Sequence, residues 1–215
     1  MNSVVEMQQC AYFSGKLMKH ETPIDNHFSR LKYHIRKSIE IDDVSFDQVK
    51  AFFSLRTVSK HQYLLRPMEV SKYESYVVKG LFQTSITDDS GRQHTLYFPH
   101  EDWWVGDFKS FKTRRESALE IVALEDSVLL QISKESLGAL FEKLPVFERF
   151  FRILNENAII ALQDRLVQNY SVDAKMKYLD FQVRYPSIQH RLLNKTVASY
   201  LGVTPEYFSA LTNKK

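Results

Sequence analysis

The chain has 215 residues, 44% hydrophobic and 26% charged, which suits one large globular domain or two modest ones. Its 29 Lys and Arg against 26 Asp and Glu give a formal charge of +3, a mild preference for anionic partners. The single Cys10 excludes an internal disulfide and a zinc or iron–sulfur site built on several thiolates. Because the sequence also has no eighteen-residue apolar run and no secretory signal, we expect a cytoplasmic protein without membrane spans.

The first segments of the chain differ in pattern. Residues 1–22 show no convincing period, and we treat them as a leader of unknown role. From Ile24 to Ile39, apolar residues recur at spacings of four and three, which predicts an amphipathic helix. A second short helix is predicted to begin at Ser45, a suitable N-cap in front of FDQVKAFF.

Between about Leu55 and Ile132, short apolar or alternating runs follow one another, from HQYLLRP and YESYVVKG to LEIVAL and SVLLQI. Turn-forming residues separate these runs, and the DDSG sequence at 88–91 is a good hairpin connection. Short strands at this spacing are typical of an antiparallel barrel or sandwich. We therefore predict a β-roll domain with flanking helices over residues 23–145.

Residues 146–170 carry an apolar stripe at steps of four and three, which predicts one long helix. Such a stripe suits packing on the same helix of a second subunit, and a core helix packed on its own domain is the alternative. The predicted dimer contacts are Phe147, Phe151, Leu154, Ala158 and Leu162. A shorter helix within SVDAKMKYLDFQVRYP follows and ends at Tyr185-Pro186, so the fold class is α+β.

The sequence NKTVASYLGVTPEYFSALTNKK indicates a helix-turn-helix within residues 171–215. Ala198 supplies the small residue where two helices cross, and Gly202 suits the turn. Thr204 can cap the second helix, and Pro205 fits its first position. The expected apolar anchors are Val197, Leu201, Val203, Phe208 and Leu211.

A β-roll, a long helix and a C-terminal helix-turn-helix, in that order, resemble the Crp/Fnr family of bacterial transcription regulators. Two stretches carry the resemblance: NKTVASYLGVTPEYFSAL, and WWVGDFKSF followed by ESALEIVALEDSVLLQI. It extends roughly from Phe28 to the C-terminus. The resemblance implies a homodimer joined through the long helix, with double-stranded DNA and RNA polymerase as partners and a small-molecule effector. The rival hypothesis is a regulatory β-roll dimer whose C-terminal unit binds another protein.

The second helix of the motif carries few basic residues. Relatives commonly have an arginine where Ala210 or Thr212 stands, whereas Glu206 matches an acidic base-reading position and could accept a hydrogen bond from a cytosine amine. Positive charge flanks the motif instead, at Arg191, Lys195, Lys214 and Lys215. Loss of DNA binding is the alternative. The predicted DNA contacts are Lys195, Thr204, Glu206, Tyr207, Ser209, Ala210, Asn213 and Lys214.

The resemblance also places a nucleotide pocket in the roll. Gly106 and Asp107 fall on the pair that contacts the ribose, and Glu116 and Ser117 fall on the Arg-Ser pair that clamps the cyclic phosphate. A carboxylate repels a phosphate, so we expect an effector other than cyclic AMP, or none. Rescue of the clamp by Arg114 or Arg115 is the alternative. The predicted pocket residues are Trp104, Gly106, Asp107, Phe108, Arg115, Glu116 and Ser117.

Four aromatic residues crowd this turn, and they form either roll core or an aromatic-lined pocket: Trp103, Trp104, Phe108 and Phe111. Other chemistries have less support. The spacing of His61, His94 and His100 does not single out a haem ligand. The sequence has no phosphate-loop, zinc-helix or nucleophile-elbow motif, so we predict no metal site, no certain cofactor and no catalysis.

Overall fold

The structure is a computed structural model that describes residues 23–213, so the predicted leader and Lys214 and Lys215 lie outside the described residues. Helix α1 (Pro23–Arg36) follows the predicted spacing and buries Phe28, Leu31 and Ile35. A loop leads from it to helix α2 (Asp43–Val49) and the 3-10 turn η1 (Lys50–Phe52).

Helix α2 begins earlier than predicted. Its N-cap is Asp42, whose carboxylate accepts a hydrogen bond of 2.7 Å from the Ser45 backbone N–H. The assignment of Ser45 as the cap is therefore wrong. Aspartate caps as well as serine does, and Ser45 instead supplies the third N–H of the first turn.

Two four-stranded antiparallel sheets form the predicted roll, with strand orders β1-β8-β3-β6 and β2-β7-β4-β5. The strands are β1 (Ser54–Val58), β2 (Tyr63–Leu65), β3 (Tyr73–Lys79), β4 (Phe82–Thr87), β5 (Gln93–Tyr97), β6 (Trp104–Val105), β7 (Glu120–Ala123) and β8 (Ser127–Ser133). Strands β4 and β5 form the hairpin predicted at 88–91, where Gly91 has a φ of +81°. Strand β1 does not stand out in the sequence, because it lies at a sheet edge and buries one residue, Val58.

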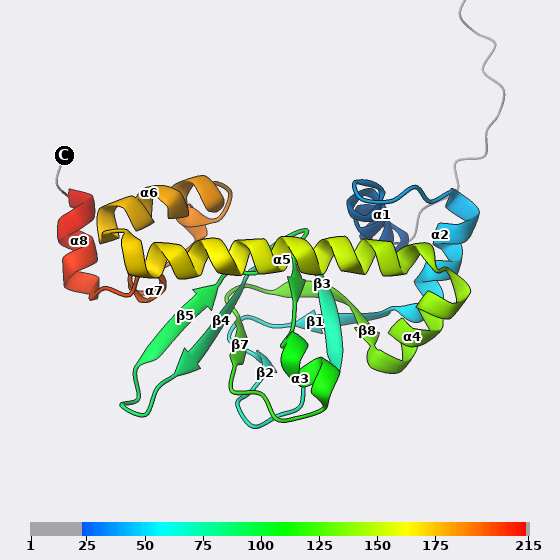
Figure 1. The fold of residues 1–215 in the computed structure, drawn as a ribbon, viewed down its shortest axis with the longest axis horizontal. Coiled ribbons are helices and arrows are strands. Elements are labelled where there is room, and N and C mark those ends of the chain that lie inside the picture. Colours follow the sequence, from blue (N-terminus) through cyan, green and yellow to red (C-terminus); the bar gives the residue numbers. More distant parts are fainter. Residues whose placement is uncertain (1–22, 214–215) are drawn as a thin grey trace, which may run out of the picture.

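Helix α4 (Lys134–Lys143) leads into the predicted long helix, α5 (Val146–Ser171), which lies along the length of the molecule above the roll (Figure 1). The first turns of α5 bury Phe147, Phe150 and Phe151 in a core shared with α1, α2, α4 and the first sheet. The alternative of a core helix therefore holds for this part of α5. The prediction that Phe147 and Phe151 are dimer contacts is wrong, because their side chains are buried within the protomer.

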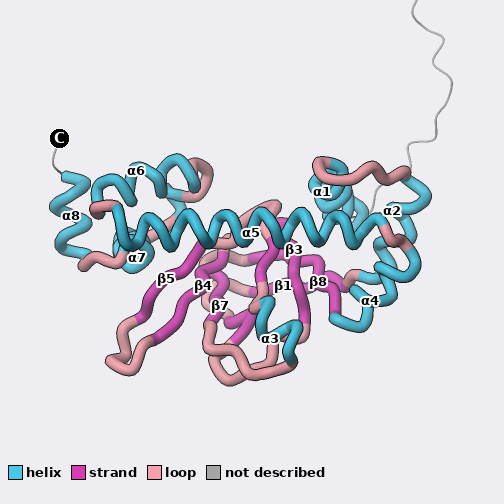
Figure 2. The backbone as a smooth tube through the Cα atoms, viewed as in Figure 1, coloured by secondary structure: helices cyan, strands magenta, loops and turns pink. Residues whose placement is uncertain are grey.

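Beyond β8 every element is helical (Figure 2). Helix α6 (Ala174–Arg184), the turn η2 (Gln189–Arg191), helix α7 (Asn194–Leu201) and helix α8 (Pro205–Asn213) form a C-terminal unit at the far end of α5. This unit packs against the roll through one apolar cluster, in which Phe98 and Leu81 of the roll meet Tyr185, Phe181 and Tyr200.

Candidate DNA-binding unit and effector pocket

The turn between α7 and α8 has the geometry that the sequence predicts. Gly202 has a φ of +74°, a left-handed conformation that glycine adopts without a steric cost. The Gly202 N–H donates to the Ser199 carbonyl at 3.3 Å, and the Val203 N–H donates to the Ala198 carbonyl at 3.0 Å. These two bonds form a Schellman motif, which ends α7 and turns the chain sharply.

Helix α8 starts as predicted. The Thr204 hydroxyl accepts a hydrogen bond of 3.2 Å from the Tyr207 N–H, and Pro205 is the first helical residue. Ala198 is fully buried at the crossing of the two helices. The expected anchors all pack in the C-terminal cluster, with Val197, Leu201 and Phe208 buried and Val203 and Leu211 half-buried. The unit has the geometry of a helix-turn-helix, with a hydrogen-bonded turn and a capped second helix.

The outer face of α8 is polar and exposed. Glu206, Tyr207, Ser209, Ala210 and Asn213 are all exposed on it, and Lys195 is exposed on α7. The Thr204 hydroxyl is engaged in its cap. Thr212, where relatives commonly have an arginine, is half-buried, and its hydroxyl donates to the Phe208 carbonyl at 3.1 Å. Lys214 lies outside the described residues.

Arg191 does not serve as a free phosphate-binding residue. Its guanidinium donates to Glu101 at 2.9 Å and to Glu125 at 2.6 Å, two acids on loops of the roll. Burial raises the pKa of Glu101, but the hydrogen bonds from Arg191 and the Gly80 N–H outweigh it and lower that pKa. The two carboxylates in turn raise the pKa of Arg191. The prediction that counted Arg191 among the DNA-facing cations is therefore corrected, because its charge is already neutralised.

Further polar contacts fasten the C-terminal unit to the roll. The Ser199 hydroxyl donates to the Gln93 carbonyl at 2.9 Å and accepts from the Thr95 N–H at 3.1 Å. Arg165 of α5 donates to the carbonyls of Thr95 and Tyr200 at 3.0 and 3.1 Å, and its guanidinium lies 3.8 Å from the Tyr200 ring centroid. The helix-turn-helix is thus held against strand β5 and α5 while the polar face of α8 stays exposed.

In the roll, the structure brings Asp107 and Ser117 together as the resemblance implies, but they are engaged with each other. The Ser117 hydroxyl donates to Asp107 Oδ2 at 2.7 Å. Asp107 Oδ1 accepts from the Ser110 N–H at 3.1 Å and caps the short helix α3 (Phe108–Thr113). Asp107 and Ser117 are both buried, so in this structure their polar atoms bind protein groups.

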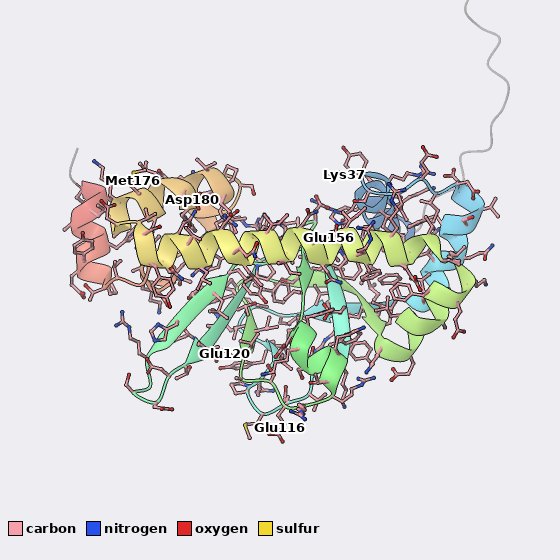
Figure 3. The ribbon with its side chains drawn as sticks, in the orientation of Figure 1. Lys37, Glu116, Glu120, Glu156, Met176 and Asp180 are labelled. Carbon is pink, nitrogen blue, oxygen red and sulfur yellow. The ribbon has the colours of Figure 1, made fainter. Side chains whose placement is uncertain are left out.

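The clamp position itself points outward. Glu116 lies at the outer edge of the roll, on the side away from α5 (Figure 3), and is exposed. Arg114 ends α3 with a φ of +60° and forms an ion pair with Glu135 of α4. Arg115 is exposed. The structure therefore gives no support to a clamp rebuilt from Arg114, whose guanidinium is held on another element.

The roll next to this position is acidic. Burial raises the pKa of Glu74 to about 8, and the neighbouring Asp107 carboxylate adds to this effect. Burial also raises the pKa of Tyr97 to about 12, while the same two acids act on it in the same direction. A buried carboxylate such as that of Asp107 opposes the entry of an anion.

The four aromatic residues have different surroundings. Trp104 and Phe111 belong to the core with α1 and α5, as the core interpretation predicts. Trp103 packs in the C-terminal cluster instead. Phe108 is 50% exposed and lines a pocket beside α5, so it is the member of the set that can meet a ligand.

Comparisons with known proteins agree with this architecture. Residues 55–144 match the cyclic nucleotide-binding domain family. A solved structure of CLP, the c-di-GMP responsive global regulator of Xanthomonas campestris, matches with a TM-score of 0.67 and 15% identity over 80% of this chain and 91% of that chain. FixK2 from Bradyrhizobium japonicum matches with a TM-score of 0.65 and 14% identity over 75% of this chain and 83% of that chain.

A protein from Eubacterium rectale assigned to the crp/fnr family of transcriptional regulators matches with a TM-score of 0.62 and 16% identity, over 80% of this chain and 82% of that chain. No curated protein sequence matches. The chain thus contains a cyclic nucleotide-binding-type roll within the fold of the Crp/Fnr regulators, which confirms the predicted resemblance. Among residues 23–213, none of the helices combines the length and the apolar character needed to cross a bilayer.

Proposed function

We propose that this protein is a dimeric, cytoplasmic, DNA-binding transcription regulator of the Crp/Fnr type, gated by an effector other than cyclic AMP. The observation that carries the proposal is the helix-turn-helix, whose capped second helix presents Glu206, Ser209 and Asn213 to solvent. A helix of this kind enters the major groove, where Glu206 would accept from a cytosine amine. Contact with RNA polymerase would follow from binding next to a promoter.

Dimer formation is supported by the second half of α5. Ile159, Leu162 and Leu166 are between 56% and 59% exposed there, on a helix whose first half is deeply buried. Exposed apolar side chains in helical register suit packing on the same helix of a second chain. Ala158 is exposed beside them and belongs to the proposed interface, whereas Leu154 is half-buried against the protomer's own core.

The exclusion of cyclic AMP is supported by charge. The position of the clamp arginine holds Glu116, and the Asp107 carboxylate lies in the adjacent buried region. We expect cyclic AMP at millimolar concentration to leave the melting temperature unchanged, because a ligand stabilises a protein only where it binds the folded state. A rise of several degrees would contradict this part of the proposal.

The experiment that tests DNA binding is selection of bound duplexes from a random pool, followed by salt titration of the selected sequence. A palindromic sequence with a steep salt dependence is expected for a dimer that reads two half-sites. Lys195→Glu should weaken binding and lower the salt slope by about one. Lys109→Glu makes the same charge change on α3 of the roll and serves as the control.

Two results would oppose the proposal. Equal weakening by Lys195→Glu and Lys109→Glu would show that net charge, and not the helix-turn-helix, controls binding. Failure to enrich any sequence, with or without small molecules extracted from cells, would favour the rival function, in which the C-terminal unit binds another protein.

A further inference from the structure

A pocket of about 200 Å³ lies between α3, α4 and the first half of α5, apart from the exposed Glu116. Its walls are mostly apolar: Phe108, Phe111, Leu137, Phe141, Phe151 and Leu154. An apolar cavity of roughly 150 Å³ is sufficient to hold benzene. The pocket therefore has room for one ring or a short aliphatic chain.

The acidic group within this pocket is the carboxyl of Glu74 on strand β3, and the half-buried Asn155 of α5 also lines the pocket. Its Oε1 atom is buried from solvent and has no hydrogen-bond partner among the described residues. A buried acceptor without a donor costs free energy, and it gains most from a ligand that donates hydrogen bonds. Gly106 leaves room for this carboxyl, because a Cβ at that position would lie 3.0 Å from Glu74 Oε2, closer than ordinary van der Waals contact.

The charged residues of the pocket lie at its rim, where they are exposed. Arg152 of α5 is committed to Glu156 at 2.6 Å, and Lys112 lies over the exposed Phe108 ring at 5.9 Å from its centroid. Glu148 adds one negative charge at the same rim. A ligand that reaches past these groups meets the Glu74 carboxyl and the half-buried Asn155 amide.

We propose that this pocket binds a small primary amine with one apolar ring or short chain, its ammonium group donating to the Glu74 carboxylate and its hydrocarbon part packing on Phe111, Phe141 and Phe151. An ammonium group supplies three hydrogen-bond donors and a positive charge. The Glu74 Oε1 atom has no hydrogen-bond partner among the described residues, so the ammonium group would provide one. The proposal concerns this pocket alone and stands whether or not the C-terminal unit binds DNA. A ligand there would touch α5 at Leu154 and Asn155, just before the exposed half of that helix.

The pocket predicts a pH dependence. Burial and Asp107 raise the pKa of Glu74 to about 8, while Lys112 lowers it, and Glu148 and Arg152 face the same space from α5. Glu74 is therefore mostly protonated at neutral pH, and binding of an ammonium ion must release that proton. The affinity for the amine should rise about tenfold per pH unit below about pH 7 and level off as the pH passes about 8.

The test compares benzylamine, benzyl alcohol and benzoate by calorimetric titration of the full chain. Benzylamine should bind at least about tenfold more tightly than the two isosteres, as expected where a buried polar group is left unpaired. Titration in buffers of different ionisation enthalpy should show release of about one proton per amine at neutral pH. This measurement uses the unaltered protein, so it holds even if a variant fails to fold.

Glu74→Gln should remove the preference for the amine and its pH dependence, while Glu148→Gln at the rim should change the affinity less than about twofold. Equal binding of benzyl alcohol, absence of proton release, or an unchanged amine affinity in a folded Glu74→Gln variant would each overturn the proposal. So would the absence of benzylamine binding at millimolar concentration.

Discussion

The two halves of helix α5 contain similar residues and have different surroundings. In the first half, Phe147 and Phe150 are 0% and 2% exposed, whereas in the second half Leu162 and Leu166 are 59% and 57% exposed. Both sets recur at helical spacing, and the helix is continuous between them (Figure 1). The difference arises from what faces the helix: α1, α4 and the first sheet cover the first half with apolar side chains, whereas the contacts of Arg165 in the second half are with backbone carbonyls of β5 and α7 and with the Tyr200 ring. Periodicity shows which face of a helix is apolar, but it does not show what covers that face.

The largest expected effect tests the buried half. Phe150→Ala should lower the free energy of unfolding by about 3 to 5 kcal/mol, because it leaves a cavity among Phe147, Phe151 and Trp104. Urea denaturation measures this change. Ile160→Ala, on the exposed half and away from the face of Leu162, is the control and should cost less than about 1 kcal/mol. Equal costs would show that the two halves are buried alike.

The next effect tests the exposed half. Leu162→Glu should weaken self-association by about tenfold or more, because it places a charge in the proposed helix–helix interface. Sedimentation as a function of protein concentration gives the dissociation constant, and the unfolding free energy of the isolated protomer should not change. Gln163→Glu adds the same charge one residue later as a control. A Leu162→Glu protein that remains as tight a dimer as the parent would place the interface elsewhere.

A smaller effect concerns the end of α5 that meets the C-terminal unit. Arg165→Met removes two hydrogen bonds to backbone carbonyls and the contact with the Tyr200 ring, at a cost of about 1 to 2 kcal/mol. Amide hydrogen exchange should become faster in β5 and α7 and stay unchanged in β3 and β8. Arg149→Met, an exposed arginine in the buried half, serves as the control. Uniform acceleration in all strands would indicate global destabilisation instead.

The smallest effect is expected midway along the helix. Arg152 and Glu156 form an exposed ion pair at i and i+4, with side chains 59% and 52% exposed. Arg152→Met should change the unfolding free energy by about 0.5 kcal/mol or less, because solvent and salt screen such pairs. Urea denaturation at low and high salt measures it. A loss several times larger would show that this pair supports the junction between the two halves.

The sequence predicts the parts of this molecule that depend on neighbouring residues. The spacing in α1, the hairpin at 88–91 and the turn at Gly202 depend on side chains a few positions apart, and all three are confirmed. The sequence does not predict contacts between residues that lie far apart in the chain. Arg191 meets Glu101 across 90 positions and Glu125 across 66, and nothing local distinguishes it from a surface cation.

The candidate sites show the same division. The helix-turn-helix follows from Ala198, Gly202 and Thr204, each of which has a local geometric role. Two other features depend on how strands and helices of the roll meet. They are the hydrogen bond from Ser117 to Asp107 and the unpaired carboxyl oxygen of Glu74. A pattern of residue types along one chain does not contain that information.

Trp103 and Trp104 are consecutive in the chain but lie in different clusters. The Trp104 ring lies 5.1 Å from Phe151 of α5, whereas the Trp103 ring lies 4.8 Å from His100 and 5.7 Å from Tyr185. The two tryptophans of the chain thus report on different clusters. The tryptophan emission of a Trp103→Phe variant comes from the core beneath α5, and that of a Trp104→Phe variant comes from the junction of the roll with the C-terminal unit. The His100 ring adjoins Trp103 and not Trp104. When acidification protonates His100, its imidazolium form should quench the emission of Trp103, and this quenching reports on the junction between the roll and the C-terminal unit.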